Sequence, residues 1–584
     1  VRQSPLATIS SLLRGRASAI NNKGAVQVAA KDNVVDPERA AMADPKTFSI
    51  KGLPLSYIIE LIVDWGGVAA IQDLTTTQIC ERFLKPITEQ SGLSLCAQLF
   101  LSNAQFKGNP LVQDASWFIS HAWQYKFTET IDSILAFAKT ENLDPSTMII
   151  WFDLFSNSQH NTAAKPFDWW QTVFMNAIKS IHNVVMVIHP WENPIPLKRV
   201  WCIFEVYACT ITSSNFHIAM TSQEELTFID ALHTPERFHT VLANINSHKS
   251  ESWNPSDRDS IFEVIQQTVG FVALDRLVFD TISNWVLSSI QKLMKPYDKE
   301  SETYLILMAV LGGCLRLQGR YQEAEEILEK CVERWKRVFG ANEPNTFSAM
   351  NFLGLVYQEQ GKLADALPIF TECLEGQTRL HGTDDLRTLR TMNHLGMVYQ
   401  NMGNFKEAES IFRECRVAAT KLFGETDLET LRYTSNLAHS LQTQSKFSEA
   451  EPLLIQCLSV FKTIHGPDHP STLLSMLNLG LFYISQKDFI RAEELLQECL
   501  ETRKRVLGPE HPDTINSHYN IIALRNAEGN IPEASRLTVQ LLQDHTNLLS
   551  SSYEPRNSSH PLKHWSKFAS ITSQKRTALT TPQP

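Results

Sequence analysis

The stretch NHLGMVYQNMGNFKEAESIFRECR, residues 393–416, decides the fold of the C-terminal half of this 584-residue chain. Its pattern returns every 42 residues, because alanines, glycines, threonines and cysteines each recur at that interval. A fixed period of this size is typical of stacked supersecondary units, so the sequence predicts an array of repeats. The four series are Ala324, Ala366, Ala408, Ala450, Ala492 and Ala534; Gly340, Gly382, Gly424, Gly466 and Gly508; Thr346, Thr388, Thr430, Thr472 and Thr514; and Cys331, Cys373, Cys415, Cys457 and Cys499.

Each unit of this array contains two helical patterns. In the second unit, residues 352–357 carry apolar side chains at helical spacing until Gly361 ends the pattern. The partner helix is predicted from Leu363 to a glycine, Gly382, that suits a left-handed C-terminal cap. One helix pair cannot cover its own apolar stripe, so neighbouring pairs must stack into a superhelix. We expect the first helix of each pair to line the inner, concave wall.

The units resemble tetratricopeptide repeats (TPR). Their 42-residue length and links such as GPDHPSTL (466–473) and GPEHPDTI (508–515) resemble the kinesin light chain type. The resemblance covers six units over residues 301–547 and implies an all-α solenoid. Units four, five and six depart from the pattern at Ser445, Lys487 and Pro532, so we expect the end units to act as caps. The heptad coiled coil that joins a kinesin heavy chain is missing, so the resemblance identifies a module and not a motor subunit.

Asparagines recur in the first helix of several units. Asn351 and Asn393 share one position, and Asn436, Asn478 and Asn520 share the neighbouring one. Side-chain amides on a concave wall can both donate to and accept from the backbone of an extended peptide. Asparagines at these positions resemble the cargo-binding groove of kinesin light chains, which implies a protein or peptide partner. The alternative is that some of these amides cap or bridge helices inside the array.

The sequence between residues 111 and 220 has a different rhythm. Apolar runs at 116–120, 147–153, 183–190 and 215–220 alternate with amphipathic helical patterns. Continuous apolar strands separated by helices predict a parallel, flavodoxin-like sheet that is covered on both faces. Such sheets place ligands beyond the carboxyl ends of their strands. We therefore expect a multidomain chain with an α/β domain before the solenoid.

The motifs FISHAW (118–123) and RVWCIFEVY (199–207), together with the order of elements, resemble a TIR domain. The Arg-Asp-Pro-Gly signature of signalling TIR adaptors is missing from the loop at 154–167. The resemblance therefore implies a TIR-like signalling domain and self-association through it, while it puts adaptor-type contacts between TIR domains in doubt.

Trp201 and Glu205 match the W-x-x-x-E arrangement of the NAD-cleaving TIR members, in which the glutamate is catalytic. The resemblance implies that Glu205 acts on NAD, while Ser120, His121 and Asp153 at the ends of the first two strands complete the binding site with Trp201. A carboxylate suits this role because glycosidases stabilise oxocarbenium-like centres in the same way. No cofactor is required, since NAD would be the substrate.

Other interpretations of these residues stay open. Trp201 would then pack on the sheet while Glu205 pairs with Arg199 or Lys198. His121 and His189 are too dispersed to predict a zinc site, which needs three or four converging ligands, and they equally suit bonds to loops at the sheet edge. We predict no metal site. The phosphate-binding GxxxxGK[ST] loop of NTPases is absent from the sequence.

The remaining segments frame these two parts. We predict a disordered leader over residues 1–46, a helical segment over 47–110, a helical connector over 221–300 and a disordered tail over 548–584. The leader has a second interpretation, since the acid-poor residues 1–31 resemble an organellar transit peptide. Otherwise the expected location is the cytoplasm.

Composition bounds the function. The net charge of −10 disfavours a nucleic-acid partner, because phosphate contact needs a basic face. No apolar run is long enough to span a membrane. Five of the ten cysteines follow the repeat, so we predict buried structural thiols. Two hypotheses remain: an interaction scaffold that binds a partner through its repeats, or a TPR-regulated NAD glycohydrolase.

Overall fold

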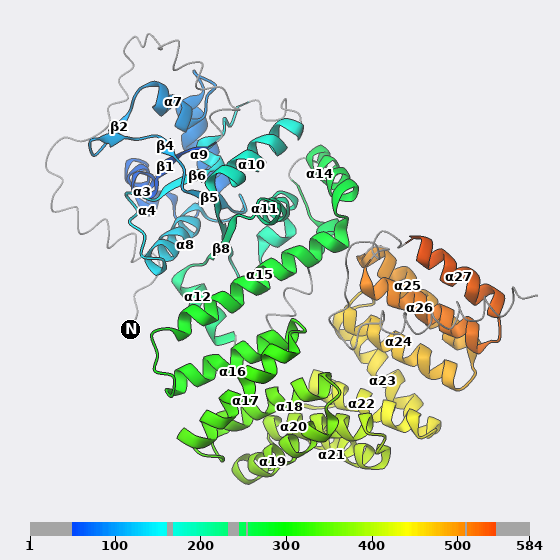
Figure 1. Ribbon diagram of the computed structural model, residues 1–584. Coiled ribbons are helices and arrows are strands. Elements are labelled where there is room, and N and C mark those ends of the chain that lie inside the picture. Colours follow the sequence, from blue (N-terminus) through cyan, green and yellow to red (C-terminus); the bar gives the residue numbers. More distant parts are fainter. Residues whose placement is uncertain (1–49, 161–166, 232–244, 253–254, 508–510, 545–584) are drawn as a thin grey trace, which may run out of the picture. The chain divides into compact units, whose positions relative to one another are not determined.

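The computed structural model describes residues 50–160, 167–231, 245–252, 255–507 and 511–544. The chain divides into two compact units, residues 1–288 and 289–584, and each is described by itself (Figure 1). The boundary falls inside the predicted connector, earlier than its expected end at residue 300. The predicted leader at 1–46 and tail at 548–584 lie outside the described residues.

The first unit is built on a mixed six-stranded sheet in the order β4–β1–β6–β5–β7–β8. Strands β6, β5, β7 and β8 pair in parallel, as the apolar runs predicted. Numbered along the chain, these four strands follow the order 2-1-3-4 of flavodoxin-like sheets. The strands are β1 (Lys51–Pro54), β4 (Gln113–Asp114), β5 (Trp117–Ser120), β6 (Ile149–Phe152), β7 (Asn183–Val187) and β8 (Asn215–Ala219).

The segment 47–110, which we predicted to be helical, contains strands as well. β1 pairs antiparallel with β4 and β6 and so extends the sheet beyond its parallel part. Gly52 permits this pairing, because a Cβ there would lie 2.2 Å from the carbonyl oxygen of Ile150. A short hairpin of β2 (Gln105–Phe106) and β3 (Asn109–Pro110) follows. The prediction was wrong here because strands of two to four residues are too short to show an alternating pattern.

Helices cover both faces of the parallel strands. Ile131 of α8 packs with Ile119 on one face, whereas Phe174 of α10 packs with Phe118 and Trp151 on the other. Both faces are therefore apolar, as a covered parallel sheet requires. The described helices of this unit are α3 (Leu55–Asp64), α4 (Val68–Ile71), α5 (Thr76–Ile79), the π-helix η1 (Cys80–Leu84), α6 (Lys85–Thr88), α7 (Leu95–Leu101), α8 (Phe127–Thr140), α9 (Asp153–Ser156), α10 (Phe167–Ile181), the 3-10 helix η3 (Ile195–Lys198), α11 (Val200–Ile211), α12 (Ser222–Ala231), the 3-10 helix η4 (Ser247–Lys249), α14 (Pro255–Thr268) and α15 (Phe271–Met294), which crosses the boundary between the units.

The second unit is an all-helical array in which helix pairs follow one another from α16 to α27 (Figure 1). We call the first helix of each pair helix A and the second helix B. The A helices are α16 (Glu302–Leu317), α18 (Pro344–Glu359), α20 (Leu386–Asn401), α22 (Leu428–Thr443), α24 (Pro470–Ser485) and α26 (Pro512–Ala527). The B helices are α17 (Tyr321–Val338), α19 (Leu363–His381), α21 (Phe405–Phe423), α23 (Phe447–His465), α25 (Phe489–Leu507) and α27 (Ile531–Asp544).

Within a unit, a glycine of helix A makes room for a large side chain of helix B. In four units a Cβ at this glycine would lie 2.4 to 2.8 Å from a leucine or phenylalanine of helix B. Only a residue without a side chain fits there, so this glycine sets the crossing of the pair together with the buried recurring alanines. The four pairs are Gly312 and Leu328, Gly354 and Phe370, Gly396 and Phe412, and Gly480 and Leu496.

The recurring cysteines join the two helices of each of the first five pairs. Every one of these thiols donates a hydrogen bond to the carbonyl oxygen of the helix A residue 26 positions earlier, at 3.4 to 3.7 Å. Burial raises the pKa of the Cys331, Cys373, Cys415 and Cys457 thiols to about 12. The thiols therefore stay protonated and unreactive at neutral pH, which supports the predicted structural role.

Candidate functional site

The A helices form one side of the array. α16 contacts α18, α18 contacts α20, α20 contacts α22 and α24 contacts α26, while Gln442 of α22 donates to Ser485 of α24 at 3.3 Å. That this side is the concave wall stays a prediction.

Four residues of each A helix, at successive spacings of four, three and four, form one stripe on that side. We call these stripes together the A face. All of the members in the three central A helices are half-buried or exposed. They are Arg390, His394, Met397 and Asn401 in α20; Arg432, Asn436, His439 and Thr443 in α22; and Leu474, Asn478, Leu481 and Ser485 in α24.

Four of the five predicted groove asparagines bond inside the array, and two of these, Asn351 and Asn393, lie off the A face. The Asn351 amide donates to Cys373 Sγ at 3.2 Å and its oxygen accepts from Thr391 Oγ1 at 3.1 Å. Asn393 is 3% exposed, and its oxygen accepts from the Asn436 amide at 2.8 Å. Their position faces the next unit, one residue away from the A face. Asn351 and Asn393 therefore bridge helices, which was the alternative interpretation.

The other three asparagines lie on the A face and are half-buried. Asn436 uses one amide hydrogen on Asn393. The Asn520 amide donates to the Asn516 carbonyl within its own helix at 2.9 Å. Asn478 lies on the same row between them. Each of these amides has two hydrogens and an acceptor oxygen, so each keeps capacity for a further bond.

Positive charge gathers near the middle of the A face. Glu429 pairs with Arg390 at 2.6 Å and with Arg432 at 3.5 Å, so two guanidinium groups share one carboxylate. The Arg432 side chain is 53% exposed. Burial first, then Arg316, Arg432 and Arg390, lower the pKa of His394 to about 3, so this imidazole is neutral at pH 7. Sequence reasoning missed these residues, although Arg432 precedes Asn436 by one helical turn and shares its stripe.

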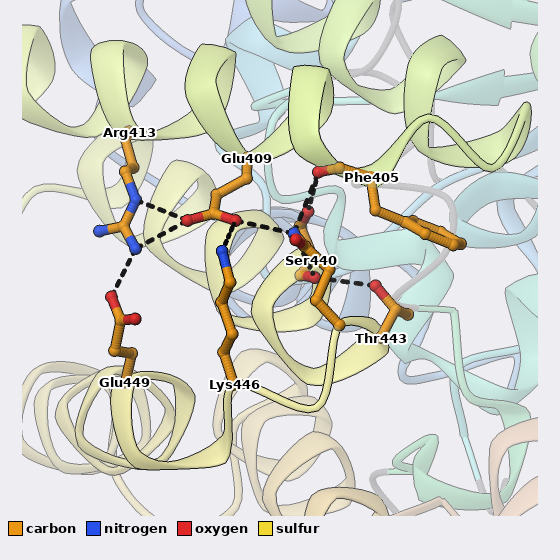
Figure 2. Close-up of polar contacts among 8 residues, drawn as sticks. Phe405, Glu409, Arg413, Ser440, Thr443, Lys446 and Glu449 are labelled. Carbon is orange, nitrogen blue, oxygen red and sulfur yellow. Dashed lines mark hydrogen bonds and ion pairs between the residues drawn. The ribbon is translucent and has the colours of Figure 1, made fainter.

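A network of ion pairs and hydrogen bonds joins helix B of one unit to the turn of the next unit. Glu409 of α21 accepts from Arg413 at 3.0 Å and from Lys446 of the next unit at 2.6 Å, and Figure 2 shows both groups around its carboxylate. Gln444 also donates to Glu409, at 2.8 Å. In an earlier unit Glu325 accepts from Gln360 and Lys362 in the same way. A helix B carboxylate thus holds the turn between the helices of the following unit.

In the N-terminal compact unit, residues 1–288, four of the predicted site residues come together at the carboxyl ends of β5 and β6. His121 Nδ1 lies 3.8 Å from Asp153 Oδ1. Glu205 of α11 is near enough to Ser120 and Asp153 for both to affect its pKa. Ser120, His121 and Glu205 are at most 6% exposed. Among the described residues, His121 Nε2 has no hydrogen-bond partner.

Burial dominates the protonation of this cluster. It raises the pKa of Glu205 to about 8, with Asp153 adding to the shift and the Ser120 hydroxyl opposing it. It lowers the pKa of His121 to about 3 and raises that of Asp153 to about 6, against the indole N–H of Trp123. At pH 7 most Glu205 is therefore protonated, His121 is neutral and Asp153 is mainly ionised.

Trp201 packs against α10. Its ring stacks on Phe174 of α10 at a centroid distance of 5.2 Å, within the apolar layer on one face of the sheet. Trp201 thus packs as the alternative interpretation had it, and a binding site shared by Trp201 and Glu205 stays a prediction. The aromatic group beside the carboxylates is Trp123, whose Nε1 donates to Asp153 Oδ2 at 2.7 Å. Trp123 lies within the quoted FISHAW motif, so its position was visible in the sequence.

His189 follows β7 and lies between two carboxylates. Its Nε2 is 3.5 Å from Glu129 Oε2 of α8, and its Nδ1 is 3.4 Å from Glu224 Oε1 of α12. In the part of the chain that the structure describes, no three histidine, cysteine or acidic side chains converge to hold a metal ion. None of the described helices is long and apolar enough to cross a membrane.

Comparison with known proteins identifies the repeats. Residues 302–379, 346–421, 387–463 and 427–489 match one tetratricopeptide repeat family, and residues 472–513 match another family of the same description. No curated protein matches the chain. The C-terminal half of the chain is therefore built of tetratricopeptide repeats, as the 42-residue period predicted.

Several solved structures are similar to the array. BtubC (BKLC) from P. vanneervenii is 20% identical with a TM-score of 0.35, covering 41% of this chain and 96% of that one. The nearly identical TPR-like repeats of a candidate kinesin light chain from Podosopora anserina are 22% identical with a TM-score of 0.31, covering 34% and 94%. YrrB, a TPR protein with an unusual peptide-binding site, is 17% identical with a TM-score of 0.25, covering 38% and 95%.

Proposed function

We propose that the chain is a protein-interaction scaffold whose tetratricopeptide array binds an extended segment of a partner along the A face. The observation that carries this proposal is the row of half-buried asparagines, Asn436, Asn478 and Asn520, at one position of three successive A helices. A row of amides that follows the array can bond the backbone of a peptide whatever its sequence. The scaffold role needs no cofactor.

The charge of the A face adds a preference for the partner's side chains. Arg390 and Arg432 share Glu429, so the pair of units that carries them holds more positive than negative charge at this point. An acidic side chain of the partner that lies beside Asn436 would pair with Arg432, because Arg432 is exposed and is bonded to Glu429 at the longer of the two distances. Guanidinium–carboxylate bonds of this kind are roughly twice as strong as neutral ones. We therefore expect bound segments to be acidic near the middle of the array.

This proposal is tested with peptides selected from a random library against the full chain. Asn436→Ala combined with Asn478→Ala should weaken their binding by about tenfold, since two bonds of about 0.5–1.5 kcal/mol each are lost. Fluorescence anisotropy measures the Kd. The matched control changes two exposed amides of B helices, Gln322→Ala and Gln497→Ala, which should leave the Kd unchanged. Equal effects of the two pairs would count against the A face.

A second candidate function is favoured by the cluster at the strand ends. The buried His121 Nε2 has no hydrogen-bond partner among the described residues, and it belongs to the same cluster as the buried Ser120 hydroxyl and Glu205 carboxyl, so a polar ligand would complete the bonding of this cluster. Together with the TIR-like motifs, this supports a TIR-like domain that hydrolyses NAD to nicotinamide and ADP-ribose. Water supplies the hydroxyl group at the ribosyl carbon, and Glu205 would stabilise the positive charge that develops there. Self-association through this domain would gate the reaction.

The protonation of Glu205 gives this second candidate a specific pH profile. Only the ionised carboxylate stabilises positive charge, and burial raises the pKa of Glu205 to about 8. Nicotinamide release should therefore rise between about pH 7 and pH 9, and Glu205→Gln should abolish it. The control is Glu89→Gln, an exposed carboxylate. If the protein releases no nicotinamide at pH 9 at high protein concentration, the NAD hypothesis is wrong, whereas the scaffold is unaffected.

A further inference from the structure

Four A helices of the array, α20, α22, α24 and α26, begin at one of two kinds of residue. Asp385 and Asp427 cap α20 and α22, and their carboxylates accept from the backbone N–H two residues later at 2.9 Å. His469 and His511 occupy the same position of the repeat before α24 and α26. Their Nδ1 atoms accept from the equivalent N–H groups of Ser471 at 3.2 Å and Asp513 at 3.1 Å. One capping bond is thus made by two chemically different acceptors.

A histidine can accept at Nδ1 only while that nitrogen is unprotonated. Protonation converts the acceptor into a donor that faces another N–H donor. It also places a positive charge at the positive end of the helix dipole. An aspartate at the same position stays ionised down to about pH 4 and keeps its cap. We propose that protonation of His469 and His511 releases the first turns of α24 and α26, so that the last two units of the array loosen in mild acid.

The surroundings of His469 do not favour its charged form. The His465 ring at the end of α23 stacks on it at a centroid distance of 4.3 Å. The neighbouring carboxylate, Asp468, is paired with Arg505 of α25 at 2.6 Å. Burial, followed by His465, lowers the pKa of His469.

His511 has a similar environment. Arg503 of α25 donates to the Asp513 carbonyl at 2.9 Å. Burial lowers the pKa of His511, and Arg503 adds to this shift while the Asp513 carboxylate opposes it. Neither histidine is therefore held charged in the folded array.

The direction of the pH effect follows from these shifts. A histidine whose pKa is lower in the folded state binds more protons when unfolded. Stability is then complete above the ordinary histidine pKa of about 6.5 and is lost as the pH falls below it. Asn478 and Asn520 lie on the two helices concerned, so acid would loosen the C-terminal part of the A face first. This inference concerns the helix caps and holds whether or not a partner binds there.

Hydrogen exchange of the full chain tests the inference. The wild type is compared with the double variant His469→Asp and His511→Asp at each pH, because comparison at equal pH removes the intrinsic change of exchange rate. At pH 7.5 peptides covering 470–485 and 512–527 should exchange equally in both proteins. At pH 5.5 they should exchange roughly fivefold faster in the wild type, as expected for a lost helix cap. Peptides covering 386–401 should not differ between the two proteins at either pH.

Two further variants separate the cap from other effects. His469→Ala loses the cap at every pH, so α24 should exchange faster than in the wild type at pH 7.5, and its difference from the Asp variant should stay constant with pH. His381→Asn removes a histidine at the end of α19 and should behave as the wild type. The inference is overturned if wild type and double Asp variant exchange alike at pH 5.5, or if they differ equally at both pH values.

Discussion

Two residues of the array adopt a backbone conformation that elsewhere in the repeat belongs to glycine. In the turn between helices A and B, Gly319, Gly361 and Gly403 have positive φ angles. At the same position Ser445 has φ 59° and Lys487 has φ 63°. A residue with a Cβ in the left-handed region costs about 1 kcal/mol or more. Ser445 and Lys487 therefore keep the backbone conformation of the turn, at the cost of strain in that backbone.

We expect Ser445→Gly and Lys487→Gly each to stabilise the array by up to about 1 kcal/mol, because glycine relieves the strain and loses part of that gain through its freer unfolded chain. Urea unfolding of the full chain measures the change as a shift of the midpoint to higher concentration. The reverse substitution Gly403→Ser, at the same place in unit three, should lower the midpoint. A lower midpoint for Ser445→Gly would contradict this account.

The candidate residues show how far single positions could be predicted. Trp201 and Glu205 are one helical turn apart, so the sequence indicated a shared side of α11. The sequence did not show that α11 lies against α10 as well as against the sheet. The Trp201 ring stacks on Phe174 of α10. Ser120, His121 and Asp153 were placed correctly, because the carboxyl ends of adjacent parallel strands meet at one edge.

At the scale of elements, neighbouring units are joined by a recurring carboxylate. Glu409 of α21 accepts from Lys446 (Figure 2) and from Gln444, the two residues on either side of the strained Ser445. Burial alone would raise the pKa of Glu409, but hydrogen bonds from Lys446, Arg413 and Gln444 bring it below its ordinary value. The bonded form of Glu409 is therefore the ionised one. We call its bonds to Gln444 and Lys446 the clip, and they hold the turn of unit four on helix B of unit three.

We expect Glu409→Gln to lower the free energy of unfolding by about 1–3 kcal/mol, because it removes charge-assisted bonds to Lys446 and Arg413. Urea unfolding at pH 7 measures the loss. Glu414→Gln, an exposed carboxylate of the same helix, is the control and should change little. A carboxyl group whose pKa is lowered by folding stabilises the protein fully only above its ordinary pKa of about 4.3. The free energies of unfolding of wild type and Glu409→Gln should therefore converge as the pH falls below this value. An equal loss in both variants would mean that the clip has no special role.

Periodicity predicted the elements of the array well, since each helix is long enough to repeat its apolar stripe. The helix predicted from Leu363 to Gly382 is α19, Leu363–His381. The cysteine series was identified as structural, but its bonds to helix A carbonyls needed coordinates. The sequence did not predict short strands such as β1, because four residues are too few to show the alternation of apolar and polar side chains. Asn351 and Asn393 were misplaced because one position along a helix turns a side chain by about 100°, from the A face toward the next unit.

For the whole molecule, the repeats determine what the array can do. In a repeat array each unit packs on its neighbours, so a surface built at one position is copied along the array. The A face inherits this regularity, and its asparagines stand where a partner segment that follows the array would meet them in turn. The central claim is that partners bind along this face.

Site-specific photo-crosslinking locates the partner most directly. A photoreactive phenylalanine analogue replaces Asn436 on the A face in one protein and Gln497 on helix B in another, each in the full chain. With a peptide selected from the library, position 436 should crosslink and position 497 should not, and unlabelled peptide should compete the product away. Crosslinking at position 497 alone, or equally at both positions, would contradict binding along the A face.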